Sequence, residues 1–165
     1  MSTRSQIGFY DKKETPNKKF EALIYRHSDG YPSAVLPDII PFLKWWKTVR
    51  GLSDLEYVSA RLLQYLCNEY DVRGKELEKQ LGTSLSKNTD YTGTLGHGIC
   101  KGFHGDIEYF YKVYPNSLQI FSCGFDESPN EYKLLVTIDL EKEVKIEEVI
   151  KLCSEVEASL TGSVK

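Results

Sequence analysis

The densest group of charged, titratable and turn-forming residues in this 165-residue chain lies between Arg26 and Pro32, at the end of an apolar run. The segment reads Arg-His-Ser-Asp-Gly-Tyr-Pro. A guanidinium binds phosphate or carboxylate through two parallel hydrogen bonds, and a carboxylate can orient an imidazole that exchanges protons near neutral pH. Asp29-Gly30 predicts a tight turn with a positive φ at the glycine. Together these residue types predict a small polar site for an anion.

Two short apolar and aromatic runs, Gln6–Tyr10 and Phe20–His27, predict a β-hairpin that would build this site. A polar loop of ordinary length joins them, so that Arg4 is expected to face Arg26 across the hairpin. The open end of the hairpin then brings residues 3–5 beside residues 26–29. The candidate ligand-binding residues of the shared hollow are Arg4, Ser5, Arg26, His27, Asp29 and Tyr31.

A purely structural interpretation of the same residues is equally available. Asp29 can cap the turn, Tyr31 can pack against the body, and His27 can be a partly buried histidine bound to a backbone carbonyl. Either arginine can pair with a carboxylate instead of a ligand. The two interpretations differ in whether the side chains converge in a concave site.

Two linked motifs mark this region, Thr3-Arg4-Ser5-x-Ile7-Gly8 and His27-x-Asp29-Gly30-Tyr31-Pro32. They resemble a pattern of uncharacterised phage and prokaryotic proteins, in which the second motif usually reads His-Trp-Asp-Gly-Tyr-Pro. Ser28 departs from that form. The resemblance covers the first fifth of the chain. It implies a shared N-terminal hairpin and no particular reaction, because no activity is established for that group.

A second polar cluster lies in a glycine-rich stretch and has the order His-x-x-Cys-x-x-x-His-x-Asp. It offers four potential zinc ligands: His97, Cys100, His104 and Asp106. The spacing matches no standard zinc module, and the surrounding glycines fix the ligands poorly. We therefore expect no required cofactor and keep zinc as an alternative. A phosphate-binding loop is excluded because these glycines precede a strand instead of joining a strand to a helix.

Composition limits the partners and the compartment. The net charge of −3 and the pI near 5.7 disfavour a nucleic-acid-binding protein. No apolar run approaches the roughly 18 residues of a membrane span, and the first residues lack the apolar core of a signal peptide. The four cysteines form no Cys-x-x-Cys pair, which is typical of reduced thiols. We expect a soluble cytoplasmic protein without a membrane partner, and homo-oligomerisation is left open.

The spacing of apolar residues in the rest of the chain predicts the helices and strands that carry these candidate residues. Helices are expected over 33–50, with the regular part after Pro41, over 55–74 with further turns to 81, and over 146–160; strands are expected over 107–114, 118–123 and 133–140. No strand-helix-strand alternation requires a parallel crossover. The prediction is an α+β fold: one domain over 1–165 with a mainly antiparallel sheet of about five strands and three or so helices packed against it. Residues 82–105 form a long glycine-rich loop, and residues 160–165 a frayed tail.

Three functional hypotheses follow. The first is a small intracellular domain, not demonstrably an enzyme, that binds an anionic small molecule such as a nucleotide or a phosphorylated metabolite at the hairpin ends. The second is a metal-assisted hydrolase or phosphodiesterase that uses His27 or His104 with Asp29 or Asp106. The third is a protein-interaction module whose surface includes the Trp45-Trp46 helix.

Overall fold

A computed structural model describes residues 3–11, 20–82, 96–124 and 126–162 of the chain. Its elements are β1 (Ser5–Phe9), β2 (Ala22–Arg26), α1 (Pro32–Val49), α2 (Leu55–Leu81), β3 (His97–Ile99), β4 (Tyr109–Val113), β5 (Ser117–Ser122), β6 (Lys133–Asp139) and α3 (Ile146–Gly162). The α+β prediction is confirmed, with a mostly antiparallel sheet of six strands in the order β3-β2-β1-β4-β5-β6. The additional strand is β3.

The centre of the sheet is a parallel pair, β1 beside β4, with Ile7 opposite Tyr111. All other neighbours in the sheet are antiparallel. The parallel pair places the N-terminal hairpin next to the C-terminal strands. Alternating hydrophobicity carries no information about which strand lies beside which, so the sequence did not predict this pairing.

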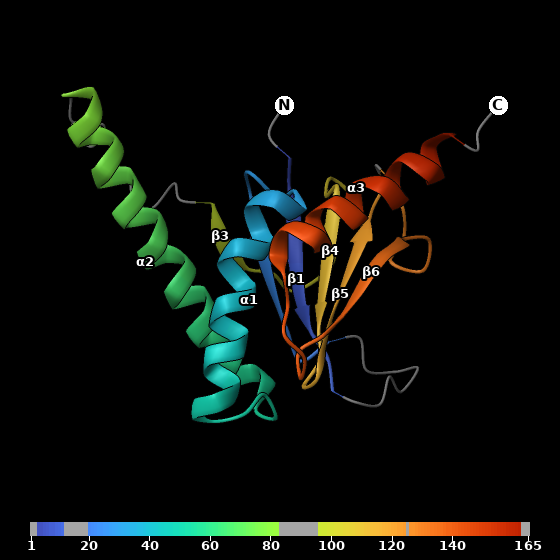
Figure 1. Ribbon diagram of the computed structural model, residues 1–165, viewed down its shortest axis with the longest axis horizontal. Coiled ribbons are helices and arrows are strands. Elements are labelled where there is room, and N and C mark those ends of the chain that lie inside the picture. The colour runs from blue at the N-terminus through green and yellow to red at the C-terminus, as the bar shows by residue number, and fades with distance from the viewer. Residues whose placement is uncertain (1–2, 12–19, 83–95, 125, 163–165) are drawn as a thin grey trace.

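The helices α1 and α3 cross one side of the sheet, which we call the helix face (Figure 1). Its main core includes Ile7 and Phe9 of β1, Ile24 of β2 and Tyr111 of β4, packed against Leu36 and other apolar residues of the helices. Figure 1 also shows α2 leaning away from the sheet, so that its C-terminal half projects beside the body. The core therefore lies mainly under α1, α3 and the first turns of α2.

The opposite side, which we call the coil face, carries a second and smaller apolar cluster. Leu23 of β2 and Phe110 of β4 belong to it, together with Ile107, Cys123 and Tyr132 from outside the strands. Irregular segments instead of helices thus cover this side of the sheet. Polar side chains can reach the strand ends between those segments.

The first helix begins earlier than predicted. It starts at Pro32 and includes both Pro37 and Pro41, whereas its regular part was expected only after Pro41. Pro32 fits the first helical position because its missing N–H would have no partner there. Pro37 and Pro41 lie four residues apart and are exposed, so water can satisfy the carbonyl groups that lose a donor.

The second helix is capped by Asp54, whose carboxylate accepts a 3.1 Å hydrogen bond from the Tyr57 N–H. It continues to Leu81 as expected.

The glycine-rich stretch after α2 contains β3, and residues 83–95 of that predicted loop lie outside the described residues. The third helix runs to Gly162, past the point where a frayed tail was expected. Among the described residues, no helix combines the length and apolar character needed to cross a membrane.

Candidate functional site

The hairpin register differs by one residue from the predicted register. Ser5, and not Arg4, lies opposite Arg26. Because side chains alternate between the two faces of a strand, this shift sends Arg4 and Arg26 to opposite faces of the sheet. The six predicted ligand-binding residues therefore do not share one hollow, and that prediction was wrong.

Arg26 has a structural role on the helix face. Its side chain is almost fully buried, its Nη1 donates a 2.8 Å hydrogen bond to Asp38 of α1, and its Nε donates one of 3.0 Å to the carbonyl oxygen of Ser28. Arg73 of α2 donates a 2.5 Å hydrogen bond to the other oxygen of Asp38. Ser5 is also buried on this side. An external anion cannot reach Arg26, because its side chain is almost fully buried together with that of Asp38.

The turn residue Gly30 joins the two sequence motifs. Its N–H donates to the carbonyl of Thr3 over 2.9 Å, and its own carbonyl accepts a 2.8 Å hydrogen bond from the Tyr111 hydroxyl. A Cβ at Gly30 would lie 2.7 Å from the carbonyl carbon of Arg4 and 2.8 Å from the Ser5 nitrogen. The positive φ of the turn is at Asp29 (52°), not at the glycine as predicted. Gly30 is therefore required for close approach between the motifs.

The two other turn residues lie at the surface. The Tyr31 hydroxyl donates a 3.3 Å hydrogen bond to Asp29, and both side chains are exposed. They lie at the end of the hairpin, where each supplies the hydrogen-bond partner of the other.

The coil face brings together a different set, which we call the Tyr25 cluster: Arg4, Tyr25, His27, His104 and Asp106. The His104 ring lies against the Tyr25 ring, with centroids 4.7 Å apart and an interplanar angle of 31°. The Tyr25 hydroxyl lies 3.5 Å from Nδ1 of His27. Arg4 forms an ion pair with Asp106, and Nδ1 of His104 lies 3.9 Å from the other carboxylate oxygen. Two predicted ligand-binding residues and two predicted zinc ligands thus meet around one tyrosine.

Gln6 positions the segment that supplies His104. It is fully buried in β1, donates to Cys100 Sγ (3.3 Å) and to the carbonyl of Gly102 (3.1 Å), and accepts from the His104 N–H (3.1 Å). The sequence analysis did not identify this residue. The available signal was an amide side chain inside a buried apolar strand, since such a group must be satisfied by hydrogen bonds.

Burial keeps the Tyr25 phenol and the Cys100 thiol protonated near neutral pH. Burial raises the pKa of Tyr25, Asp106 raises it further, and Arg4 opposes the change, so the phenol remains a hydrogen-bond donor at neutral pH. Burial also raises the pKa of the Cys100 thiol, against the hydrogen bond from Gln6. A thiol with a raised pKa is a poor nucleophile and a poor metal ligand near pH 7.

The four predicted zinc ligands do not converge. His97 lies opposite Arg26 in the β2–β3 register and so belongs to the helix face, whereas Cys100 packs with the coil-face cluster. No group of three or more histidine, cysteine or carboxylate side chains suited to a metal occurs in the part of the chain that the structure describes. The zinc-site prediction is therefore wrong in its geometry, because the one-residue alternation of β3 separates its members.

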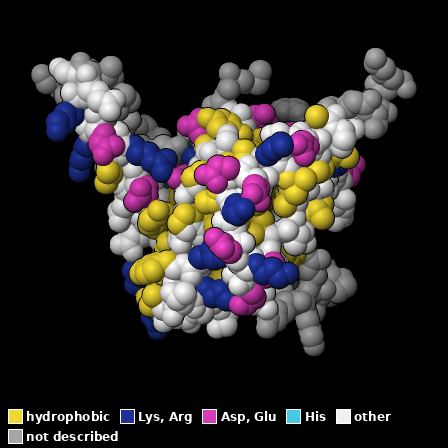
Figure 2. All heavy atoms as spheres, viewed as in Figure 1, with side chains coloured by type: hydrophobic (Ala, Val, Ile, Leu, Met, Phe, Trp, Pro, Cys, Tyr) yellow, Lys and Arg dark blue, Asp and Glu magenta, His cyan; other side chains and the backbone are white. Residues whose placement is uncertain are grey.

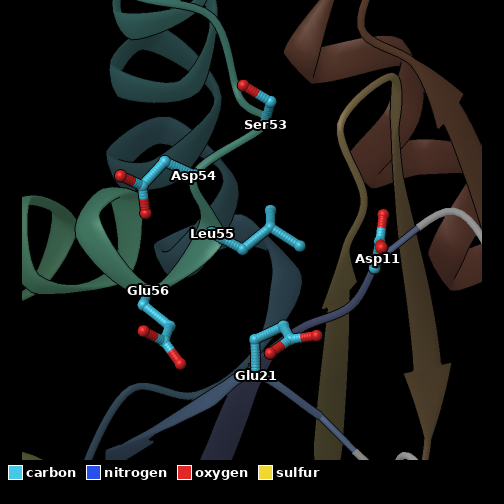
Figure 3. A pocket seen from close by; sticks show the side chains of 6 residues that line it. All are labelled: Asp11, Glu21, Ser53, Asp54, Leu55 and Glu56. Atoms are coloured by element: carbon cyan, nitrogen blue, oxygen red, sulfur yellow. The ribbon is translucent and has the colours of Figure 1, made fainter.

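A cavity of about 190 Å³ lies at the other end of the hairpin, next to the start of α2 (Figure 3). Its lining residues are Asp11, Glu21, Ser53, Asp54, Leu55 and Glu56. Four of these six side chains carry carboxylates, so the cavity repels anions. The acidic lining therefore makes this cavity unsuited to the anion that the sequence predicts.

Comparison of the chain with protein-family models, with curated proteins and with solved structures found no significant match in any of the three.

Proposed function

We propose that this chain binds a small anionic molecule, such as a nucleotide or a phosphorylated metabolite, at the Tyr25 cluster. The observation that supports the proposal is the convergence of the Arg4 guanidinium with the imidazoles of His27 and His104 around Tyr25. The site excludes Ser5 and Arg26, which are buried on the other face. Asp29 and Tyr31 are exposed on the turn that follows β2.

The chemistry of these groups suits a phosphoryl group. Guanidinium and imidazole N–H groups donate to phosphate oxygens, and a protonated imidazole adds positive charge. Asp106 neutralises part of the charge of Arg4 but also holds its guanidinium in place. The Tyr25 hydroxyl supplies a neutral donor at the centre of the cluster. Such preorganised donors limit the entropy lost on binding.

The proposal is tested by titrating inorganic phosphate and AMP into isotopically labelled protein and following the Arg4 and histidine signals by NMR. Arg4→Gln and His104→Gln are each expected to weaken binding about tenfold, equivalent to about 1.4 kcal/mol. Lys151→Gln, which removes an exposed cation on α3, is the matched control and should leave binding unchanged. Equal affinity in all three variants would overturn the proposal.

A second function is favoured by one specific observation, the arrangement of His104 and Asp106. Oδ1 of Asp106 is buried without a hydrogen-bond partner and lies 3.9 Å from Nδ1 of His104. A carboxylate so placed can orient an imidazole that takes a proton from water as the water oxygen attacks the phosphorus of an ester bound by Arg4, with the ester's alcohol as the leaving group. We therefore also propose a hydrolase or phosphodiesterase that uses this His104–Asp106 pair. Release of 4-nitrophenol from bis(4-nitrophenyl) phosphate should be measurable and should be lost in Asp106→Asn; absence of release in the wild type would exclude this function.

A further inference from the structure

A patch of aromatic, aliphatic and arginine side chains lies where α1 ends and α2 begins. We call it the Trp45 patch and define it as Trp45, Val49, Arg50, Tyr57 and Arg61. Trp45 and Val49 are each 55% exposed although both are large and apolar. Figure 2 shows hydrophobic side chains beside Lys or Arg side chains at this lower left corner of the molecule. The patch lies on α1 and α2, whereas the Tyr25 cluster lies on the coil face of the sheet.

The patch rests on a rigid aromatic base. Trp46 is buried, stacks on Phe42 with centroids 5.7 Å apart at 15°, and also contacts Tyr57 at 5.8 Å. Trp45 packs edge-on against Trp46 at 5.7 Å. The exposed Trp45 ring and the half-buried Tyr57 ring are therefore packed in place before any partner arrives, which lowers the entropy cost of binding.

Its two guanidinium groups surround one phenol. The guanidinium carbons of Arg50 and Arg61 lie 5.1 Å and 5.0 Å from the centroid of the Tyr57 ring, and Arg61 donates a 3.0 Å hydrogen bond to the Tyr57 hydroxyl. The pKa of Tyr57 is lowered, chiefly by this hydrogen bond and by the charges of the two arginines. Both arginines thus create a positive field at the same point of the surface.

No carboxylate within the described ranges pairs with Arg50 or Arg61. The other partner of Arg61 is the neutral amide of Gln64, at 2.9 Å. By contrast, Lys47 on the same helix as Trp45 forms an ion pair with Glu141. The patch therefore combines two arginines that form no ion pair within the described ranges with exposed apolar area.

We propose that the Trp45 patch docks an acidic segment of a partner protein, with an apolar side chain of that segment seated against Trp45 and Val49. Tryptophan, tyrosine and arginine are the residue types that contribute most binding energy in protein interfaces, and here all three are adjacent. Charge complementarity to the two arginines requires carboxylates on the partner. Two cations are too few for strong binding to nucleic acid, where affinity grows with the number of phosphates neutralised.

The test begins with a random peptide library displayed on phage, selected on the wild-type protein and depleted on the Trp45→Ala/Arg50→Gln/Arg61→Gln variant. Enriched peptides are expected to carry several Asp or Glu around an aromatic or aliphatic residue. One such synthetic peptide is then titrated by calorimetry. Trp45→Ala alone and Arg50→Gln/Arg61→Gln together should each weaken binding at least tenfold, and added salt should weaken it further.

The control variant is Lys151→Gln/Leu152→Ala on α3, which removes one cation and one exposed apolar side chain elsewhere on the surface. It should bind the peptide as the wild type does. The far-ultraviolet circular dichroism of every variant must match the wild type, which the exposure of the substituted side chains predicts.

Failure to enrich any peptide, enrichment of basic or neutral ones, or equal binding by the Trp45→Ala variant would overturn the proposal. Patch-dependent binding of a thymidine oligonucleotide or of phosphatidylserine vesicles in place of acidic peptides would also overturn it.

Discussion

Gly30 shows how one residue without a side chain holds the two N-terminal motifs together. Its φ is not in the left-handed region, so alanine could adopt the same backbone conformation. The obstacle is space, because the new Cβ would meet backbone atoms of Arg4 and Ser5 at 2.7 Å and 2.8 Å. Backbone cannot move aside as a flexible side chain can. The turn would have to separate from β1.

We expect Gly30→Ala to lower the free energy of unfolding by about 2–4 kcal/mol, since overpacking against backbone is costly. Urea unfolding followed by tryptophan fluorescence measures the change. Gly98→Ala is the matched control, because a Cβ there meets nothing within 4 Å, and it should change stability by less than about 0.5 kcal/mol. Equal effects of the two substitutions would contradict the role given to Gly30.

Cys153 should make the stability fall at alkaline pH. It is buried between α3 and the sheet, and burial raises the pKa of its thiol from about 9 to about 11, with a further contribution from Glu157. The unfolded chain therefore loses this proton at a lower pH than the folded chain does. The contribution of the thiol is complete below pH 9 and is lost as the pH rises from 9 to 11.

The measurement is the stability difference between the wild type and Cys153→Ala at pH 8 and at pH 11. This difference should shrink by at least about 1 kcal/mol over that interval, since one pKa unit corresponds to about 1.4 kcal/mol. Comparing the two proteins at each pH cancels the titration of the tyrosines, which both contain. A difference that stays constant would mean that the thiol titrates equally in both states.

The residue types of the candidate site could be predicted from the sequence, but not the faces on which they lie. Every residue of β1 is buried, so its hydrophobic pattern contains no alternation that could fix the register. An error of one residue was enough to place Arg4 with Arg26 instead of with His27. For the same reason Gln6 looked like an ordinary strand residue, although it holds the segment that supplies His104.

At the scale of elements, Asp38 is the point where α1, α2 and β2 are joined. Its two oxygens bind Arg26 and Arg73, and its side chain is as buried as that of Arg26. Arg26 has no water to replace a lost partner, whereas the Arg73 side chain is 52% exposed. The two ion pairs of one carboxylate should therefore differ greatly in their contribution to stability.

We expect Asp38→Asn to destabilise the protein by about 3–5 kcal/mol, because it leaves the Arg26 charge buried without compensation. Arg73→Gln removes only the exposed partner and should cost less than about 1 kcal/mol. Chemical denaturation of both variants provides the comparison. Similar losses in the two variants would show that the buried pair and the exposed pair are equivalent, contrary to the geometry.

The elements that the sequence predicted well are those with long periodic patterns. The apolar spacing of α2 and α3 was sufficient, as was the pattern of the strands expected over 107–114 and 118–123. The regular part of α1 was placed too late because Pro41 removes a hydrogen-bond donor, although exposed positions tolerate proline. β3 was missed because a short run with glycine on both sides of His97 has neither strand propensity nor alternation.

For the whole molecule, the parallel pairing of β1 with β4 is the decisive arrangement. It inserts the N-terminal hairpin between β3 and the C-terminal strands, so that both parts of the chain complete one sheet. The main core likewise combines Ile7, Phe9 and Leu36 with Val113, Ile120 and Ile138. Neither part of the chain alone supplies all the apolar residues that are buried on the helix face of the sheet. The parallel pairing also brings Asp106 and His104, which precede β4, beside Arg4 of the hairpin.

This interdependence predicts the behaviour of the two parts when they are separated. Peptides 1–82 and 96–165 should each give poorly dispersed proton NMR spectra, because each would expose the edge of β1 or β4 and half of the core. Mixing them in equal amounts should restore the dispersed signals of the intact protein, with an affinity that falls when Ile7→Ala is introduced, since Ile7 is fully buried opposite Tyr111. The sharpest contrary result would be cooperative thermal unfolding of 96–165 alone. That result would mean that β4, β5, β6 and α3 form a unit of their own, and that the Tyr25 cluster is assembled between two independent folding units instead of within one.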